Sequence, residues 1–154
     1  MNAEQLQITL RSSQYAEQVL ELHRTFLEQD FQLDRFTAHL SRDDIFQTVE
    51  QTLEGIEDEA TWMKSLRILR ARLMFRWIWQ DANQQTDVVT LTRELSDFAD
   101  ASICAAKRFA LGPLLAKHGE PLGYSGEVQD LIVIGMGKLG AQELNLSSDI
   151  DLIF

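Results

Sequence analysis

Most of the chain carries apolar residues three and four positions apart, which is the spacing of one face of an α-helix. Ser12 or Ser13 suits the start of one helix, and Ser41 begins a capping box in which Asp44 replaces the usual glutamate. We therefore predict that residues 1–120 form a helical bundle. The apolar stripes that show this spacing are Tyr15, Val19, Leu22 and Phe26; Ile45, Val49, Leu53 and Ile56; Trp62, Leu66, Leu69, Leu73 and Trp77; and Val88, Leu91, Leu95, Phe98, Ser102 and Phe109.

After His118 the chain changes character. Residues 119–126 are rich in turn-forming residues and indicate a linker or loop. Residues 131–134, Leu-Ile-Val-Ile, are typical of a short buried strand. We expect a short helical piece over residues 141–144 and a second strand over residues 149–154. The predicted fold class is therefore mainly α, with two short strands near the C-terminus.

The two predicted strands cannot form a complete sheet by themselves. A single short crossover does not cover both faces of a sheet, and small isolated sheets are only marginally stable in water. The apolar end Leu152-Ile153-Phe154 also lacks the polar residues expected of a frayed terminus. We therefore expect the chain to be the N-terminal fragment of a longer protein.

The composition of the chain argues against several classes of partner and against secretion. The chain has 14 Lys and Arg against 24 Asp and Glu, a formal net charge of −10. This charge argues against nucleic-acid and anionic-membrane partners, because phosphate contacts need clustered cations. A single cysteine cannot form an internal disulfide, and the N-terminus lacks the basic and apolar regions of a secretory signal. We expect a cytoplasmic protein.

Gly135, Gly137 and Gly140 satisfy the pattern G-x-G-x-x-G directly after the first predicted strand. This pattern can form a dinucleotide-binding turn, but such a unit needs about 30 residues, with an acidic partner about 20 residues downstream. Here only eight residues separate Gly140 from Asp149. A P-loop fails as well, because its first glycine is missing and the lysine of the run is followed by leucine. The spacing argues against both interpretations.

Asp149 and Asp151 are two positions apart in the second predicted strand. Their side chains are therefore expected on one face, ~6.6 Å apart along the chain. Ile150, Leu152 and Phe154 are expected to fill the opposite, core-facing side. Two carboxylates at this separation can share one or two Mg²⁺ ions, which prefer oxygen ligands.

The glycine run would lie beside these carboxylates and offer main-chain N–H groups to phosphate oxygens. Its glycines are expected to serve the backbone geometry of the loop whichever ligand binds. Lys138 either adds a positive charge for the phosphate or is an exposed loop cation. Ser148 either orients a carboxylate, touches phosphate or caps a turn. Together these residues suit metal-assisted transfer at phosphorus.

Residues 131–154 closely resemble the signature of the bifunctional glutamine synthetase adenylyltransferase/adenylyl-removing enzymes, a family of large bacterial proteins with two nucleotidyltransferase-type domains. The signature motif of the N-terminal, adenylyl-removing domain is similar to Glu143-Leu144-Asn145 followed by Ser147-Ser148-Asp149. The resemblance extends back through Leu66–Arg70, Met74–Trp77 and Leu95–Asp100.

The resemblance implies a nucleotidyltransferase fold, in which a glycine loop after one strand leads to an Asp-x-Asp on the next. On this interpretation residues 121–154 are a truncated nucleotidyltransferase core. Asp149 and Asp151 would be catalytic and bind Mg²⁺. The fold normally adds a third carboxylate on a later strand, which this chain does not contain, so we expect the isolated chain to be inactive. The residues implied to bind nucleotide or phosphate are Gly135, Gly137, Lys138, Gly140 and Ser148.

The reaction that the resemblance implies is a phosphorolysis. Inorganic phosphate attacks the adenylyl phosphorus on a tyrosine of adenylylated glutamine synthetase, which releases ADP and the unmodified enzyme. The implied partners are adenylylated glutamine synthetase, a PII-type nitrogen regulator, and ADP or phosphate. Two alternatives remain open: a helical interaction module without chemistry, or a nucleotidyltransferase that modifies another acceptor.

Other conspicuous side chains are expected to have structural roles. Trp62, Trp77 and Trp79 suit core packing. Cys104, among alanines, is expected to be a small buried hydrophobe, and His118 a helix cap or surface residue. The arginines of one helix are expected to form a charged surface face; alternatively, some of them face the transfer core or the acidic first segment. These arginines are Arg67, Arg70, Arg72 and Arg76.

Overall fold

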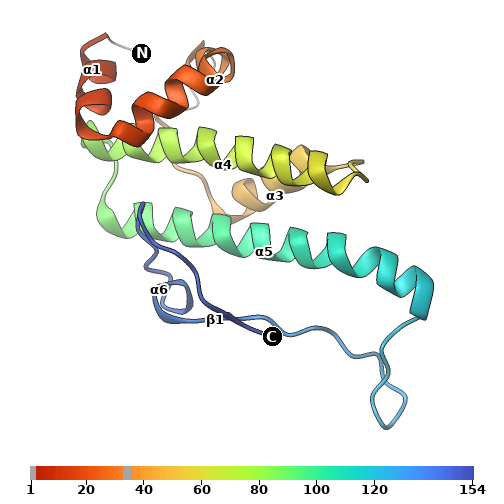
Figure 1. The fold of residues 1–154 in the computed structure, drawn as a ribbon. Helices are drawn as coiled ribbons and strands as arrows, with labels where there is room; N and C mark the ends of the chain where they lie inside the picture. Colours follow the sequence, from red (N-terminus) through yellow and green to blue (C-terminus); the bar gives the residue numbers. More distant parts are fainter. Residues whose placement is uncertain (1–2, 33–35) are drawn as a thin grey trace.

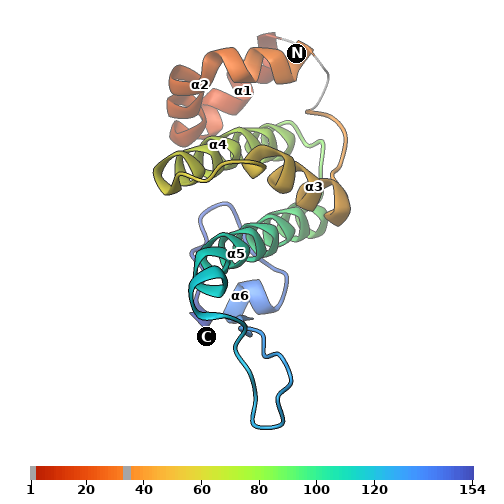
Figure 2. The ribbon, with the colours of Figure 1, turned by 90° about the vertical axis from the view of Figure 1, so that its right-hand side faces the viewer.

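The structure, a computed structural model, describes residues 3–32 and 36–154. Its elements are α1 (Ala3–Ser12), α2 (Gln14–Gln32), α3 (Arg42–Leu53), α4 (Glu59–Ala82), α5 (Val88–His118), β1 (Ile134–Gly135), α6 (Gly137–Gly140) and β2 (Leu152–Ile153). They are stacked in layers: α1 and α2 lie on one side of α4, α3 packs on both α4 and α5, and α6 with the strands lies beyond α5 (Figures 1 and 2). The predicted fold class, mainly α with two short strands near the C-terminus, is confirmed.

The two longest helices, α4 with 24 residues and α5 with 31, form the middle of the stack and run antiparallel (Figure 1). Pro113 lies inside α5 without ending it. No helix within the described ranges combines the length and the apolar character that crossing a bilayer requires.

Two of the helix starts follow from serine side chains. At the start of α2 the Ser13 hydroxyl accepts a hydrogen bond from the Ala16 N–H at 3.2 Å, so Ser13 rather than Ser12 caps this helix. At the start of α3 the Ser41 and Asp44 side chains each accept a hydrogen bond from the other's main-chain N–H. The predicted capping box is therefore confirmed.

The helices α4 and α5 both start at an aspartate. The Asp58 carboxylate accepts hydrogen bonds from the N–H and hydroxyl of Thr61, and Asp87 does the same for Thr90. These bonds hold the pKa of both carboxyls below its ordinary value, chiefly through the Thr61 hydroxyl for Asp58 and the Thr90 N–H for Asp87. Both carboxylates also lie at the positive end of a helix dipole, which stabilises their charge.

The core consists of two hydrophobic clusters that share α4. The larger joins α3, α4 and α5 with two leucines from the C-terminal segment, and the smaller joins α4 with α2 and Phe36. Trp77 is fully buried (0% exposed), and its indole N–H donates to Glu94 Oε2 at 2.8 Å. Trp62 stacks on Phe109 with ring centroids 4.9 Å apart. The predicted core role of all three tryptophans is confirmed: Trp62, Trp77 and Trp79 are buried.

The apolar stripe predicted for α2 is partly wrong. Leu22 is 78% exposed, and the next buried residue along the helix is Leu27. Between them α2 is kinked at His23, where the backbone leaves the helical region (φ −128°, ψ 25°). Phe26 is also exposed, and it lies under the Arg72 guanidinium at 5.5 Å from the ring centroid. The buried residues Ala16, Val19 and Leu27 keep helical spacing across the kink, so the buried face of α2 is rotated from the predicted stripe along the whole helix.

Cys104 is exposed, so its prediction as a buried residue is wrong. The face of α5 that joins the core contains Ala101 and Ala105, four positions apart. Cys104 comes one position before Ala105 and is therefore rotated by about 100° from that residue. Neighbouring alanines in the sequence do not by themselves indicate burial. His118 ends α5 and is exposed, as expected.

The segment after α5 is a loop, as predicted, and it forms a small hairpin. Leu122 bridges Val128, and the Gln129 N–H donates to the Pro121 carbonyl at 2.8 Å. Just beyond the hairpin the Asp130 carboxylate pairs with Lys107 of α5 at 2.5 Å, which lowers the pKa of Asp130. This ion pair attaches the loop to the helix.

The two strands are shorter than predicted. They pair antiparallel, with Ile134 opposite Ile153 and Gly135 opposite Leu152. Residues 131–133 and 149–151 lie outside them. A sheet of this size can cover little apolar surface.

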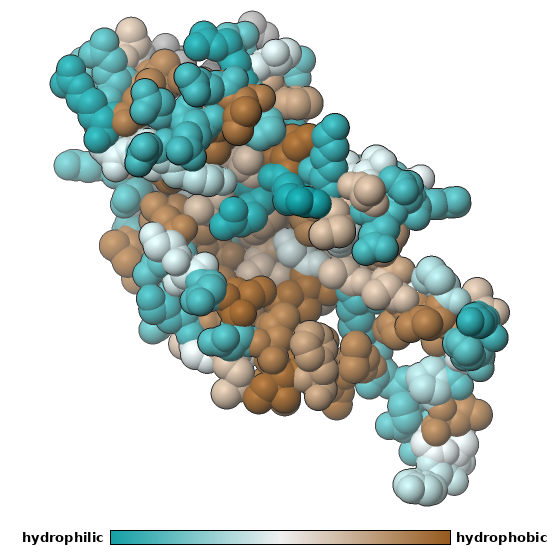
Figure 3. Space-filling view, viewed as in Figure 1, coloured by the Kyte–Doolittle hydropathy of each residue, from teal (hydrophilic) through white to brown (hydrophobic). Residues whose placement is uncertain are grey.

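The apolar residues of the strand segments are mostly exposed, which contradicts their prediction as buried or core-facing. Leu152 does pack against the larger cluster, but Ile150 is 41% and Phe154 78% exposed. Figure 3 shows hydrophobic side chains gathered over the lower central part of the view, where the strands lie. No second layer packs on the outer face of the strands within the described residues. The exposed members are Leu131, Ile132, Ile134, Met136, Ile150, Ile153 and Phe154.

Candidate functional site: the glycine turn and the aspartate pair

The strands bring the glycine run and the aspartate pair together. The Met136 N–H, just before α6, donates to the Asp151 carbonyl at 2.9 Å. This bond continues the antiparallel pairing of β1 with β2. The turn over residues 135–140 therefore lies directly beside the segment that carries Asp151.

The glycines of the run are required by the turn itself. Gly137 has a φ of +54°, in the left-handed region that favours glycine. A Cβ on Gly140 would lie 2.6 Å from the Gly135 carbonyl oxygen, and one on Gly135 would lie 2.8 Å from Leu139 Cγ. The main chain thus packs against itself, which side chains at these positions would prevent. Their expected role in backbone geometry is confirmed.

The helical turn falls inside the glycine run rather than after it. The sequence predicted a helical piece over residues 141–144, but α6 covers Gly137–Gly140. Gln142 has a φ of +59°, which is incompatible with continuing the helix. Leu144 follows outside any helix and is buried. The local geometry of the glycines, rather than the helix propensity of the later residues, decides where the turn forms.

Asp149 and Asp151 both precede β2 and are exposed. Because they lie outside the strand, the alternation of a strand does not fix their relative direction, and their common orientation stays a prediction. Within the described part of the chain neither carboxylate is engaged in a side-chain hydrogen bond or ion pair. Both carboxylates are therefore available to a cation.

The chemistry of these donors fits Mg²⁺. This ion prefers oxygen ligands and is usually held by one or two carboxylates together with phosphate oxygens and water. Among the described residues no cluster of three or more His, Cys, Asp or Glu could hold a metal. Asp149 and Asp151 could supply two of the oxygen ligands, and their binding of Mg²⁺ stays a prediction.

The other two predicted site residues differ in what surrounds them. Lys138 lies within α6 and is exposed, with no ion pair to another described residue. The Ser148 hydroxyl donates to Asn145 Oδ1 at 2.9 Å and accepts from the Asn145 N–H at 3.1 Å. Ser148 therefore closes the turn that precedes Asp149, as its turn-capping alternative expected. A contact of either residue with phosphate stays a prediction.

The helix α5 holds the segment after the glycine turn in place, which sequence reasoning missed. The Leu144 N–H donates to the buried Ser96 hydroxyl oxygen at 3.2 Å, and the Gln142 amide lies 3.4 Å from Asp100. Leu139 and Leu144 are 3% and 5% exposed and belong to the larger cluster. Ser96 and Asp100 lie in the run Leu-Ser-Asp-Phe-Ala-Asp, which carried the resemblance but had no role assigned to it.

Arg42, the first residue of α3, connects that helix to the same part of α5. Its guanidinium pairs with Asp97 and, at 3.0 Å, with Asp100. The hydrogen bond to Asp100 is the largest cause that raises the pKa of Arg42. A chain of polar contacts therefore runs from α3 through α5 to Gln142. The capping box predicts the position of Arg42 in its helix, but no sequence signal pairs it with α5.

The arginines of α4 do not form one solvated face. Arg72 donates to both carboxylate oxygens of Asp30, at 2.9 and 2.6 Å, so it faces the acidic first segment as the alternative proposed. Arg76 is only 6% exposed and donates to the Ala38 carbonyl. The other two arginines are exposed. The predicted charged surface is therefore correct for half of the set.

Comparison with known proteins agrees with the resemblance. Residues 3–154 match the family described as glutamate-ammonia ligase adenylyltransferase. The chain is 76% identical over 154 residues to a bifunctional glutamine synthetase adenylyltransferase/adenylyl-removing enzyme of Acinetobacter baylyi, covering 100% of the chain and 17% of that protein. Proteins with the same description from Thioalkalivibrio sulfidiphilus and Pseudomonas putida are 42% and 43% identical over 106 and 107 residues, 69% of this chain and 11% of each relative.

The chain thus spans only a small part of the length of these relatives, 17% in the Acinetobacter protein. The family match nevertheless includes the helices as well as the glycine turn and the aspartate pair. On this match over nearly its whole length, the chain belongs to the glutamate-ammonia ligase adenylyltransferase family.

Proposed function

We propose that this chain is the N-terminal part of an enzyme that removes AMP from adenylylated glutamine synthetase by Mg²⁺-dependent phosphorolysis. An oxygen of inorganic phosphate forms a bond to the adenylyl phosphorus, and the bond from that phosphorus to the tyrosine oxygen breaks. The tyrosine oxygen takes up a proton, and ADP leaves. The observation that carries the proposal is the hydrogen bond from the Met136 N–H to the Asp151 carbonyl, which places the glycine turn beside the aspartates.

In this proposal Asp149 and Asp151 hold the Mg²⁺, and the turn over residues 135–140 holds phosphate oxygens through main-chain N–H groups. Lys138 adds a positive charge near the same oxygens. Mg²⁺, when bound, neutralises charge on the phosphate oxygens and orients them, which supplies most of the rate in transfers at phosphorus. Ser148 fixes the turn from which Asp149 emerges, as its hydrogen bonds with Asn145 suggest.

The proposed partners are adenylylated glutamine synthetase, a PII-type nitrogen regulator, and ADP or phosphate. The descriptions of the relatives name glutamine synthetase, which supports the first of these. The formal net charge of −10 disfavours nucleic acid and anionic membranes as partners.

The isolated chain is proposed to be inactive. The fold that the resemblance implies normally adds a third carboxylate on a later strand, and the apolar strand residues of this chain are exposed to solvent. A noncatalytic interaction module and a nucleotidyltransferase for another acceptor are the competing functions, and both are outcomes of the test that follows.

The test uses Asp149→Asn and Asp151→Asn in the full-length protein, each assayed for adenylyl removal and for adenylyl addition. Removal is measured as phosphate-dependent release of ADP from adenylylated glutamine synthetase. We expect removal to fall by about a hundredfold or more, because several kcal/mol of charge stabilisation is lost, while addition persists. Asp130→Asn is the matched control, since this exposed carboxylate pairs with Lys107 outside the turn.

Unchanged removal in both variants would exclude the proposed metal role and favour the noncatalytic alternative. Loss of addition with removal intact would assign the aspartates to the opposite reaction. Failure of the wild-type protein to release ADP from adenylylated glutamine synthetase, with activity toward another adenylylated protein, would favour the other-acceptor alternative.

A further inference from the structure

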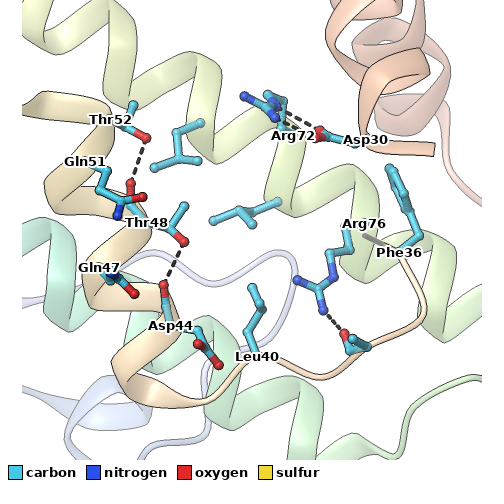
Figure 4. A pocket seen from close by; sticks show the side chains of 13 residues that line it. Asp30, Phe36, Leu40, Asp44, Gln47, Thr48, Gln51, Thr52, Arg72 and Arg76 are labelled. Carbon is cyan, nitrogen blue, oxygen red and sulfur yellow. Dashed lines mark hydrogen bonds and ion pairs between the residues drawn. The ribbon is translucent and has the colours of Figure 1, made fainter. Parts of the chain in front are cut away.

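A cavity of about 630 Å³ opens between α3 and α4, next to the end of α2 (Figure 4). None of its lining residues belongs to the glycine turn or the aspartate pair. The volume lies within the range of pockets that bind small molecules. The polar part of its lining includes Asp44, Gln47, Thr48, Gln51, Arg72 and Arg76.

Arg76 is the unusual residue of this cavity. Its side chain extends from α4 toward the cavity in Figure 4, yet the residue is only 6% exposed. One terminal nitrogen donates to the Ala38 carbonyl, whereas the buried Nε finds no hydrogen-bond partner among the described residues. Arg72, one turn earlier, differs because two of its nitrogens bind the Asp30 carboxylate.

The charge of Arg76 is compensated only from a distance. Burial is the largest influence and lowers its pKa, and the carboxylates of Glu94 and Asp30 oppose that effect without forming an ion pair with it among the described residues. A buried donor without a partner destabilises the fold, and more so when the group is charged. An oxyanion in the cavity would offset the cost of burying the guanidinium charge.

The surroundings limit the charge of such an anion. Among the described lining residues, Arg72 and Arg76 are balanced by Asp30 and Asp44. Hydrogen bonds from Ser41 lower the pKa of Asp44, which therefore stays ionised near neutral pH and repels a dianion. A ligand with a single negative charge meets the Arg76 guanidinium with less repulsion than a dianion does.

The remaining walls favour a ligand with an organic body. Leu69 and Leu73 line the cavity from α4, and Gln47 and Gln51 line it from α3. The Thr48 hydroxyl donates to the Asp44 carbonyl, so toward the cavity it can act only as an acceptor. We propose that this cavity binds a small monocarboxylate, whose carboxylate accepts a hydrogen bond from the Arg76 guanidinium. The site is separate from the aspartate chemistry and does not depend on it.

The experiment observes the ligand in the presence of the full-length protein. Sodium butyrate is the probe, and saturation transfer from protein to the butyrate methyl group measures binding at constant ionic strength. We expect transfer in the wild-type protein, at least a tenfold reduction in Arg76→Gln, and no reduction in Arg67→Gln, an exposed arginine of the same helix. Butyramide, which has the same shape without the charge, should give no transfer.

A second variant tests the proposal even if Arg76→Gln does not fold. Gln51 is exposed on α3, so Gln51→Trp is expected to keep the fold and fill the cavity while Arg76 remains. It should also abolish transfer to butyrate. Absence of transfer in the wild-type protein, or equal transfer in all variants, would overturn the proposal. Phosphorus line broadening of inorganic phosphate that is lost in Arg76→Gln, with butyrate inert, would overturn the assignment to a carboxylate.

Discussion

The Leu144 N–H donates a hydrogen bond to the hydroxyl oxygen of Ser96 at 3.2 Å, and Ser96 is fully buried. Ser96→Ala leaves this buried N–H without a partner, so we expect the free energy of unfolding to fall by about 1–3 kcal/mol. Urea unfolding followed by circular dichroism measures the change. Ser102→Ala is the control, because the Ser102 hydroxyl only donates to the Phe98 carbonyl of its own helix. Equal losses in both variants would show that the bond to Leu144 adds nothing.

The glycine turn should not tolerate a methyl group at Gly140. In Gly140→Ala the new Cβ would lie 2.6 Å from a main-chain oxygen, so the turn must shift. We expect adenylyl removal by the full-length protein to fall at least tenfold, because a shift of about 1 Å can cost a hundredfold in rate. Gly112→Ala in α5, where nothing lies within 4 Å of the added Cβ, should leave activity unchanged. Full activity in Gly140→Ala would contradict the proposed role of the turn.

Removing the Glu94 carboxylate should destabilise the helical region. Its oxygens accept the Trp77 indole N–H at 2.8 Å and the Leu40 N–H at 3.1 Å. Glu94→Ala leaves both donors unpaired, and we expect a loss of about 2–4 kcal/mol in thermal or urea unfolding. The comparison is Glu50→Ala, whose exposed pair with Arg108 should contribute less than about 1 kcal/mol. A loss of that small size in Glu94→Ala would refute the structural importance of the buried contacts.

The aspartates that start α4 and α5 make stability depend on acid pH. The pKa values of Asp58 and Asp87 are lowered in the folded chain, so each stabilises the fold above its ordinary pKa, about 3.9. This stabilisation is lost as the pH falls from there through the lowered pKa. Asparagine caps helices about as well as aspartate but does not titrate. The double variant Asp58→Asn, Asp87→Asn should therefore lose helical circular dichroism less steeply below about pH 4 than the wild type. Superimposable acid titrations would disprove this contribution.

Features that depend on neighbours in sequence could be predicted. The capping box of Ser41 and Asp44 needs only residues three positions apart, and Trp62 and Trp77 of α4 follow a stripe that no kink interrupts. The proximity of the glycine turn to Asp151 also follows from the short spacing between the two strands. In each case the interacting residues are close in sequence, so the sequence pattern predicts the interaction.

Features that depend on packing could not be predicted. The buried face of α2 and the exposure of Cys104 both depend on the direction from which the neighbouring helices approach. Arg42 is separated from Asp100 by 58 positions, and Gln142 adopts a left-handed conformation that asparagine or glycine would have signalled and glutamine does not. The lengths of the strands likewise depend on partners rather than on their own apolar residues.

Two buried leucines, one in the glycine turn and one just after it, have a consequence for how the molecule unfolds. Leu139 and Leu144 belong to the same cluster as Trp77 of α4 and Phe98 of α5. More than twenty residues of helix end and loop lie between Phe98 and these two leucines along the chain. The turn cannot detach without opening the hydrophobic contacts of the helices, so both should melt together as one cooperative unit. Amide hydrogen exchange at Leu144 would then be as slow as in the middle of α5. The conformation of the turn would be as stable against local opening as the helices on which it packs.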